Sequence, residues 1–459
     1  MLQRVVTLNA RVGFRVVLST IVVALIVGLL AVFTYQSRPS HNSPVIDLLD
    51  KESACVNPYA ENGFVWFQDK DDVTDATWVP FYEGILDQDY KETRNIEQIK
   101  AEQLYSEGPP PRPVLELSPF NWIEALARLH TLLLKSWRID GDGYWTSSET
   151  PNGQLSPDEL RELREYESLL SWIKNRRMLM VSDSIDRFQL AFFCDRLDRP
   201  PVVGPHGRHS TQWCHVPYLN FTVVHWHISS YVTNRPSWWW DIVRIVPVEE
   251  RWTKFFLPTV DKLIGMNGRS PDLIILQSGL WDQRMYAAAY KADNEEEELD
   301  YSRPLNWPEL RFYMQRERNL IALLREQFGN GVPMVYRMST LQRTKERNSN
   351  LHDINRAARF VAHETDVEIM DFGNMVQGHE HLYFDFVHIG RGPLSTVWAN
   401  MWLGYLFRGQ GGVEVKGRIL QMPTEDKQYN VSENWNFCHE KFMNDHHKWE
   451  SQTTNRNRN

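Results

Sequence analysis

Short apolar runs alternate with amphipathic stretches over residues 176–410 of the chain. The runs are rich in Val, Ile, Leu and Met, and their alternation with helical patterns is typical of a parallel sheet covered by helices. We therefore expect an α/β domain of the three-layer α/β/α sandwich type. The expected strands are Met178–Val181, Phe221–Trp226, Leu273–Leu276, Met334–Tyr336 and Val367–Met370.

Three stretches carry apolar residues at the spacing of one helix face. The first, Asn121–Trp137, lies in residues 116–175, which we expect to form a helical segment before the sheet. The second begins near Pro308 and ends at the first glycine after it, Gly329. The third covers Asp353–Glu364.

Residues 16–37 contain no charged side chain and consist mostly of Val, Leu, Ile and Ala. At about 1.5 Å per residue, a helix of this length crosses the roughly 30 Å hydrocarbon core of a bilayer. Arg4, Arg11 and Arg15 precede it without an acidic residue, so the positive-inside rule places residues 1–15 in the cytoplasm. A cleaved signal peptide is the alternative, but the run is long for one and no small-x-small cleavage site follows. We expect a signal anchor in a single-pass type II membrane protein of the ER or Golgi, with the rest of the chain lumenal.

The segments on either side of the helical segment and the α/β domain have irregular patterns. Residues 38–115 look like a stem and end in the proline cluster Pro109–Pro113, and residues 411–459 form a C-terminal extension with a polar tail. The chain has 459 residues, of which 42% are hydrophobic, and a net charge of −9. This composition excludes a disordered or polytopic membrane protein, and the acidic balance argues against nucleic acid as a partner.

Cysteines and glycosylation sequons fit a lumenal location. Two disulfide bridges are possible, and their three connectivities cannot be separated from sequence. The sequons begin at Asn220 and Asn430, although Asn220 sits in an apolar run that would bury it. The four cysteines are Cys55, Cys194, Cys214 and Cys438.

A short acidic stretch, Asp140–Gly143, resembles part of a calcium-binding EF-hand loop, with Glu149 at the spacing of the closing ligand. Arg138 occupies the first ligand position, where an oxygen donor is required. We therefore favour a turn between helices over a calcium site, and we expect no metal and no cofactor.

Polar residues with catalytic chemistry follow three of the expected strands. Ser184 lies in a strand-to-helix turn, where its hydroxyl would be exposed beside backbone N–H groups suited to an oxyanion. Gly279 follows another strand and can bring its backbone close to a substrate. Asp385 precedes His388 by three residues and can hold the imidazole in the tautomer that a serine-activating base needs.

Each of these features also has a purely structural interpretation. Ser182-Asp183-Ser184 can be a helix N-cap, and Gly279 can be an ordinary turn glycine. With 15 histidines, about one Asp-x-x-His is expected by chance at ordinary aspartate usage. Their common placement favours chemistry, because the carboxyl ends of parallel strands meet at one edge of a sheet.

The order Ser-Asp-Ser, Gly-x-Trp-Asp, Asp-x-x-His resembles that of the SGNH/GDSL hydrolase superfamily. It is most similar to the PC-esterase branch, which includes the trichome-birefringence-like polysaccharide O-acetyltransferases. The stretch Arg177–Gln189 is similar to the Gly-Asp-Ser-x-x-Arg-x-Gln block of that branch, and Cys194 falls where the branch often has a cysteine. Asp385–His388, with Trp398 and Asn400 after it, resembles the Asp-x-x-His block and its trailing Trp-Asn. A signal anchor is also shared with the plant wall acetyltransferases.

The resemblance implies a role for each matching residue. Ser184 would be the acyl-accepting nucleophile, His388 the general base and Asp385 the partner that orients it. The backbone N–H groups of Ser184 and Gly279 would form the oxyanion hole. The resemblance also implies that Arg187 and Trp281 bind the substrate.

Three positions depart from the pattern or stay open. Ser182 replaces the first glycine of the Gly-Asp-Ser block, which changes the backbone freedom beside the nucleophile. Trp281 stands where classical members have an oxyanion asparagine, although the PC-esterase branch also favours tryptophan there. The glycine of the second block is either Gly204 or Gly207.

The expected activity is acyl transfer through a Ser-His-Asp triad, with an acyl donor and a glycan or polysaccharide acceptor as partners. Transfer to water would make the protein an acetylesterase, and transfer to a sugar hydroxyl a glycan O-acetyltransferase. An inactive carbohydrate-binding or scaffold protein is the alternative, because Ser182 replaces the motif glycine. The chain holds 18 tryptophans, and we expect Trp281 and Trp238–Trp240 to line the acceptor cleft.

Overall fold

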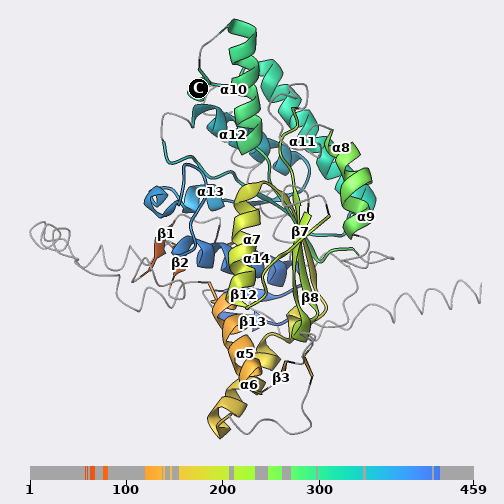
Figure 1. The fold of residues 1–459 in the computed structure, drawn as a ribbon, viewed down its shortest axis with the longest axis vertical. Helices are drawn as coiled ribbons and strands as arrows, with labels where there is room; N and C mark the ends of the chain where they lie inside the picture. The colour runs from red at the N-terminus through yellow and green to blue at the C-terminus, as the bar shows by residue number, and fades with distance from the viewer. Residues whose placement is uncertain are drawn as a thin grey trace, which may run out of the picture. The chain divides into compact units, whose positions relative to one another are not determined.

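The apolar runs form a central sheet that is parallel across five neighbouring strands (Figure 1). In the computed structural model the spatial order of these five is β11, β10, β9, β5, β8. The expected strands are all present, and their ends differ from the expected ones by no more than one residue. The bounds are β5 (Arg177–Ser182), β8 (Phe221–His227), β9 (Leu273–Leu276), β10 (Met334–Arg337) and β11 (Glu368–Met370).

The structure describes residues 57, 59, 63–67, 76–80, 119–136, 138–139, 145–146, 155–205, 211–232, 247–260, 270–295, 298–344, 348–415 and 418–423. All of them belong to one unit that spans Ser53–Asn459. Within these ranges no helix is both long enough and apolar enough to span a bilayer. Several sequence-based expectations fall on residues outside these described ranges. They are the anchor at 16–37, the turn at Asp140–Gly143, the cleft residues Trp238–Trp240, the sequon at Asn430, and the cysteines Cys55 and Cys438.

The sheet is not parallel throughout, because two further strands continue it beyond β8 in the antiparallel sense. These are β7 (Thr211–Val216) and β6 (Val202–Val203). Strand β7 reaches β8 through the 3₁₀ turn η3 (Pro217–Leu219), a connection too short for the crossover that a parallel neighbour needs. Asn220 ends this turn in the left-handed conformation and is exposed, so it is not buried as its apolar neighbours suggested.

Side chains of the parallel strands alternate between two apolar layers. On β5, Met178 and Met180 face one layer, whereas Leu179 and Val181 face the other. Figure 1 shows helices on both sides of the sheet, which gives a three-layer α/β/α arrangement. The first layer is built from α5 (Trp122–Ser136), α7 (Ser184–Arg196) and α14 (Pro393–Gly409). The second contains α11 (Trp307–Phe328), α12 (Ser349–Glu364) and the π-helical turn η6 (Trp252–Phe256).

Capping residues fix where two helices begin. Asn306 accepts the Glu309 N–H, and the Glu309 carboxylate accepts the Asn306 N–H, so α11 starts at the expected place. Ser156 and Glu159 form the same reciprocal cap on α6 (Pro157–Leu169). Another helix, α10 (Leu280–Asn294), follows Gly279 and was not expected from the pattern.

Part of the segment expected to be a stem belongs to the folded unit. Strands β1 (Gly63–Trp66) and β2 (Thr77–Pro80) pair in the antiparallel sense, and Val65 and Trp78 join the first apolar layer. The remaining elements are short: β3 (Arg138–Ile139), β4 (Trp145–Thr146), η2 (Ser171–Ile173), α8 (Val248–Arg251), α9 (Leu257–Val260), α13 (Phe372–Met375), η9 (Glu380–Leu382), β12 (Val413–Val415) and β13 (Arg418–Gln421).

Two of the four cysteines lie within the described residues. Cys194 on α7 and Cys214 on β7 are both buried and both free thiols. Burial and the neighbouring Cys214 thiol raise the pKa of Cys194, so it stays protonated and unreactive at neutral pH.

Candidate active site

The chain turns sharply from β5 into α7, and this turn carries Ser184. Asp183 is the N-cap of α7, and its carboxylate accepts the Ile185 N–H at 2.8 Å. Ser184 is therefore the first helical residue, and its N–H has no acceptor within the helix. Asp183 is thus the helix N-cap that the Ser-Asp-Ser sequence suggested. The Ser184 hydroxyl is not used for capping and is available for another partner.

That partner is His388, from a loop 204 positions later in the chain. The Ser184 Oγ lies 2.7 Å from His388 Nε2, and His388 Nδ1 lies 2.6 Å from Asp385 Oδ2. Since the Asp385 carboxylate can only accept at that distance, the proton belongs on Nδ1 and Nε2 is free to accept from Ser184. The structure thus joins the three side chains in one hydrogen-bonded chain.

Asp385 is held by the backbone of its own loop. Its Oδ1 accepts the N–H groups of Val387 at 2.8 Å and His388 at 2.7 Å, while Oδ2 faces the imidazole. Partial burial opposes ionisation, but the hydrogen bonds from His388 and the two N–H groups outweigh it and lower the pKa of Asp385. The carboxylate is therefore ionised at neutral pH.

Two phenylalanines hold the ring of His388. Phe384 stacks on it with 5.5 Å between ring centroids and an angle of 11°, and Phe188 meets it edge-on at 4.8 Å. Phe188 comes from α7, the helix that also carries Ser184. Phe188 and Phe384 also contact each other, with 5.4 Å between ring centroids, so together they restrict the imidazole while its two nitrogens face Ser184 and Asp385.

Gly279 lies at the same edge of the sheet as Ser184. Strand β9 pairs with β5 in parallel register, with Leu276 opposite Val181, so the turns that follow both strands are neighbours. Gly279 has φ of +138°, and a Cβ there would lie 2.7 Å from Ser339 Oγ. Both the backbone conformation and the lack of space therefore favour glycine at this position. An ordinary turn glycine would need only the backbone conformation.

Ser182 does not disturb the turn although it replaces a glycine of the motif. It is the last residue of β5 and pairs in register with His227, and its carbonyl accepts the Ile228 N–H at 2.7 Å. This is extended backbone that any residue adopts, so the position has no need of glycine. The observation removes the reason for expecting a decayed site.

The two residues carried over as substrate-binding are partly or wholly buried. Arg187 follows Ser184 on α7, is 6% exposed, and places its guanidinium carbon 4.9 Å from the centre of the Phe188 ring. Trp281 lies in the first turn of α10, half-buried, with its ring 6.3 Å from that of His227. Their contact with a substrate stays a prediction.

A buried ion pair beneath the Ser184 turn was not expected from the sequence. Arg337, at the end of β10, lies 2.7 Å from an oxygen of Asp186, and Trp398 donates its indole N–H to the same carboxylate at 3.0 Å. Burial, more than any other factor, raises the pKa of Asp183 to about 6, although Arg337 lies 3.6 Å away and opposes the shift. Trp398 is thus a buried anchor for α7, and Asn400 bonds to the start of α5.

Gln277 was also not singled out by the sequence. This fully buried residue follows β9 and accepts the Asp183 N–H at 3.3 Å. Its side-chain nitrogen donates to the Ser278 carbonyl, one residue before Gly279. The only sequence signal was its position two residues before the motif glycine.

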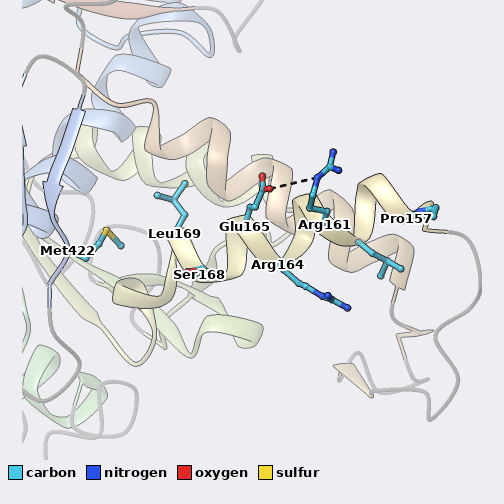
Figure 2. A pocket seen from close by; sticks show the side chains of 8 residues that line it. Pro157, Arg161, Arg164, Glu165, Ser168, Leu169 and Met422 are labelled. Carbon is cyan, nitrogen blue, oxygen red and sulfur yellow. Dashed lines mark ion pairs between the residues drawn. The ribbon is translucent and has the colours of Figure 1, made fainter.

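The described ranges hold no group of three His, Cys, Asp or Glu side chains suited to a metal ion. A separate pocket of about 790 Å³ lies along α6, and its lining includes none of Ser184, His388 and Asp385 (Figure 2). Its lining residues are Pro157, Leu160, Arg161, Arg164, Glu165, Ser168, Leu169 and Met422.

No protein-family profile and no curated protein matches the chain. Among solved structures it is similar to an acetylxylan esterase from Geobacillus stearothermophilus, with 14% identity, 51% of this chain and 94% of that chain covered, and a TM-score of 0.30. It is also similar to a lipase/acylhydrolase from Enterococcus faecalis, with 13% identity, 55% and 99% coverage, and a TM-score of 0.28. An α/β hydrolase from the metagenome of Lake Arreo, Spain, has 14% identity, 52% and 97% coverage, and a TM-score of 0.30. Such low TM-scores assign neither a family nor an activity, so any function has to be inferred from the site itself.

Proposed function

We propose that the protein is a serine-dependent acyl-transfer enzyme whose triad is Ser184, His388 and Asp385. The observation that carries the proposal is the pair of hydrogen bonds on the two nitrogens of His388, 2.7 Å to the Ser184 hydroxyl and 2.6 Å to the Asp385 carboxylate. A nucleophile, a base in reach of it and a group that orients the base are the parts that covalent acyl transfer requires.

In the first half of the reaction, His388 Nε2 takes the Ser184 proton while the serine oxygen attacks the carbonyl carbon of an ester. The Asp385 carboxylate stabilises the imidazolium that forms. The oxyanion would be bound by the backbone N–H groups of Ser184 and Gly279, and the imidazolium then returns its proton to the departing alcohol. The product of this half is an ester between the acyl group and Ser184.

In the second half, His388 Nε2 takes the proton of an acceptor hydroxyl while the acceptor oxygen attacks the acyl carbon. The ester bond to Ser184 then breaks, and the imidazolium returns its proton to the Ser184 oxygen. Water as acceptor gives an acetylesterase, and a sugar hydroxyl gives a glycan O-acetyltransferase. We propose the acetyl ester of a glycan as donor or product. An N-terminal anchor at residues 16–37, with the site in the lumen, agrees with a substrate of the secretory pathway. The proposals of a glycan substrate and of a membrane anchor rest on the sequence.

The triad is tested by labelling purified full-length protein with a fluorescent fluorophosphonate, which reacts with activated serines. Labelling is expected on wild type and absent from Ser184→Ala. Ser182→Ala is the matched control, because it removes the other hydroxyl of Ser-Asp-Ser, which has no hydrogen-bond partner in the described part of the chain. Equal labelling of Ser184→Ala and wild type, or no labelling of either, refutes the proposal.

Hydrolysis and transfer are separated by following acetyl groups from p-nitrophenyl acetate, with and without a mixture of neutral oligosaccharides. For a transferase, part of the acetyl should appear on the oligosaccharides, and the release of p-nitrophenol should rise when the acceptor is present. Release to water alone, at a rate that the acceptor does not change, identifies an esterase.

A further inference from the structure

Gln277 bonds to both of the turns that carry the proposed oxyanion donors. Its side-chain oxygen accepts the Asp183 N–H at 3.3 Å, one residue before Ser184. Its side-chain nitrogen donates to the Ser278 carbonyl at 2.8 Å, one residue before Gly279, and to Ser339 Oγ at 2.8 Å. The amide is thus used at both ends, and its two ends face two different turns.

Ser339 completes the link on the Gly279 side. Its hydroxyl donates to the same Ser278 carbonyl at 2.9 Å, and it lies where a Cβ of residue 279 would be. The carbonyl of Ser278 belongs to the peptide group that supplies the Gly279 N–H. Together with a longer bond of 3.4 Å from the Tyr336 hydroxyl, these two hydrogen bonds to the Ser278 oxygen restrict the rotation of that peptide and the direction of its N–H.

This arrangement matters because the two turns follow different strands. The Ser184 turn continues β5 and the Gly279 turn continues β9, and the backbone pairing between them extends to the Gln277 N–H, which donates to the Val181 carbonyl at 3.0 Å. Two N–H groups can bind one oxyanion only if both lie about 2.7–3.1 Å from it. A shift of either turn by a fraction of an ångström would break this condition.

We propose that Gln277 is a positioning residue that fixes the spacing and direction of the Ser184 and Gly279 N–H groups, and thereby the oxyanion hole. It touches neither substrate nor nucleophile and acts only through the two turns. The inference rests on the proposed function, since it concerns the same site, and it adds a residue that the sequence motif does not contain.

The proposal is tested with Gln277→Met, which keeps the length of the side chain and removes its hydrogen bonds. Gln277→Glu keeps an acceptor for the Asp183 N–H and, when ionised, has no donor for Ser278 or Ser339. Gln283→Met is the matched control, because Gln283 is an equally buried glutamine on α10 whose side chain bonds to Asn350 at 2.7 Å and to Gln342, and the substitution keeps its backbone N–H bond to the Gly279 carbonyl. All variants are compared with wild type as full-length protein.

Turnover of p-nitrophenyl acetate and inhibition by a small alkylboronic acid, which forms a tetrahedral adduct with an active serine, are measured together. For both Gln277 variants we expect kcat to fall about 10- to 100-fold, with KM within about threefold, since loss of an oxyanion donor costs about 10²–10³-fold in kcat. The boronate affinity should fall by a similar factor. Gln283→Met should keep kcat within about threefold, even where its melting temperature falls as much as that of Gln277→Met.

Two results would contradict the positioning role of Gln277. A Gln277→Met protein that folds and keeps wild-type kcat, or a Gln283→Met protein with the same loss of kcat and boronate affinity, shows that Gln277 is merely structural. Partial recovery of kcat in Gln277→Asn at unchanged melting temperature would support positioning. Absence of turnover in wild type overturns the proposed function itself, and the positioning role with it.

Discussion

Arg337 and Asp186 form an ion pair with no exposure to solvent, 2.7 Å from Nε to the nearer carboxylate oxygen. They lie 151 positions apart in the chain, on β10 and on the first turn of α7. Asp186 also accepts the Trp398 indole N–H from α14 at 3.0 Å. One carboxylate therefore ties the helix that begins at Ser184 to the sheet and to a second helix.

Replacement of Arg337 with methionine should be strongly destabilising. The change leaves the Asp186 carboxylate buried without a cation, and breaking a buried pair in this way costs about 3–5 kcal/mol. Urea unfolding followed by circular dichroism measures the loss in the free energy of unfolding. The double variant Arg337→Met with Asp186→Leu should recover part of it, because the Asp186 carboxylate is gone and only Asp183 still lacks its cation. A single variant that loses less than about 1 kcal/mol would show that the pair has little effect on stability.

Gly279→Ala should lower both stability and turnover. Its Cβ would meet Ser339 Oγ at 2.7 Å, and φ of +138° is a conformation that alanine rarely adopts. We expect a loss of about 1–3 kcal/mol in the free energy of unfolding and a reduced kcat, because the turn must shift.

Gly329→Ala is the control for Gly279→Ala. Gly329 has φ of +90° but nothing within 4 Å of the added Cβ, and it lies after α11, away from the Ser184 turn. It should lose stability through backbone strain and keep kcat. Equal loss of kcat in both variants would contradict a special role for the Gly279 turn.

Asp385→Asn should remove most of the activity without unfolding the protein. The amide can still accept the backbone N–H groups of the loop, but its NH₂ would donate to His388 Nδ1. The imidazole would then carry its proton on Nε2, where it cannot accept from Ser184, and such a change costs about 10³–10⁴-fold in kcat. Steady-state ester turnover measures the effect, with Asp371→Asn, another half-buried carboxylate in an ion pair, as control. Activity within tenfold of wild type would exclude the proposed tautomer control.

The sequence predicted the parallel strands and the three residues of the hydrogen-bonded chain because both depend on local signals. Apolar runs as short as Leu273–Leu276 favour buried strands over helices, and parallel strands bring the residues after them to one edge. Helix α14 gave no such signal, because nearly all its residues are buried and no amphipathic period remains.

The supporting contacts were not predictable in the same way. Arg337 and Asp186, or Gln277 and Asp183, are brought together only by the order of the strands, which sequence patterns do not specify. An arginine at a strand end is also ordinary until its burial is known. Trp398 belongs to the motif, but only its burial shows that it is an internal anchor.

A buried carboxyl next to the Gly279 turn should make stability depend on pH. Glu317 on α11 has no exposure, and its Oε2 accepts the hydroxyls of Ser278 at 2.9 Å and Tyr231 at 2.8 Å. Burial raises the pKa of Glu317 to about 7, with a further rise from Asp282, although the hydrogen bonds from Tyr231 and Ser278 oppose it. The folded protein therefore holds a proton that the unfolded chain releases near its ordinary value of 4.5.

The sign of the pH dependence follows from that difference. Between about pH 4.5 and 7 the folded state binds more protons than the unfolded state, so the free energy of unfolding should fall as pH rises and level off above pH 7. Asp183 and Asp282, whose pKa values burial raises to about 6, act in the same direction.

Glu317→Gln removes one part of this dependence, because the amide is neutral at every pH and keeps an oxygen for Ser278 and Tyr231. Relative to wild type, the variant should gain stability on the order of 1–3 kcal/mol at pH 8 and show a shallower decline from pH 4.5 to 7. Glu326→Gln, on an exposed position of the same helix, serves as control and should follow the wild-type curve. Urea midpoints measured every half pH unit give the three curves. If the wild-type and Glu317→Gln curves run parallel, Glu317 is already ionised in the folded protein, and the Ser278 hydroxyl is then bound to a buried charge throughout this range.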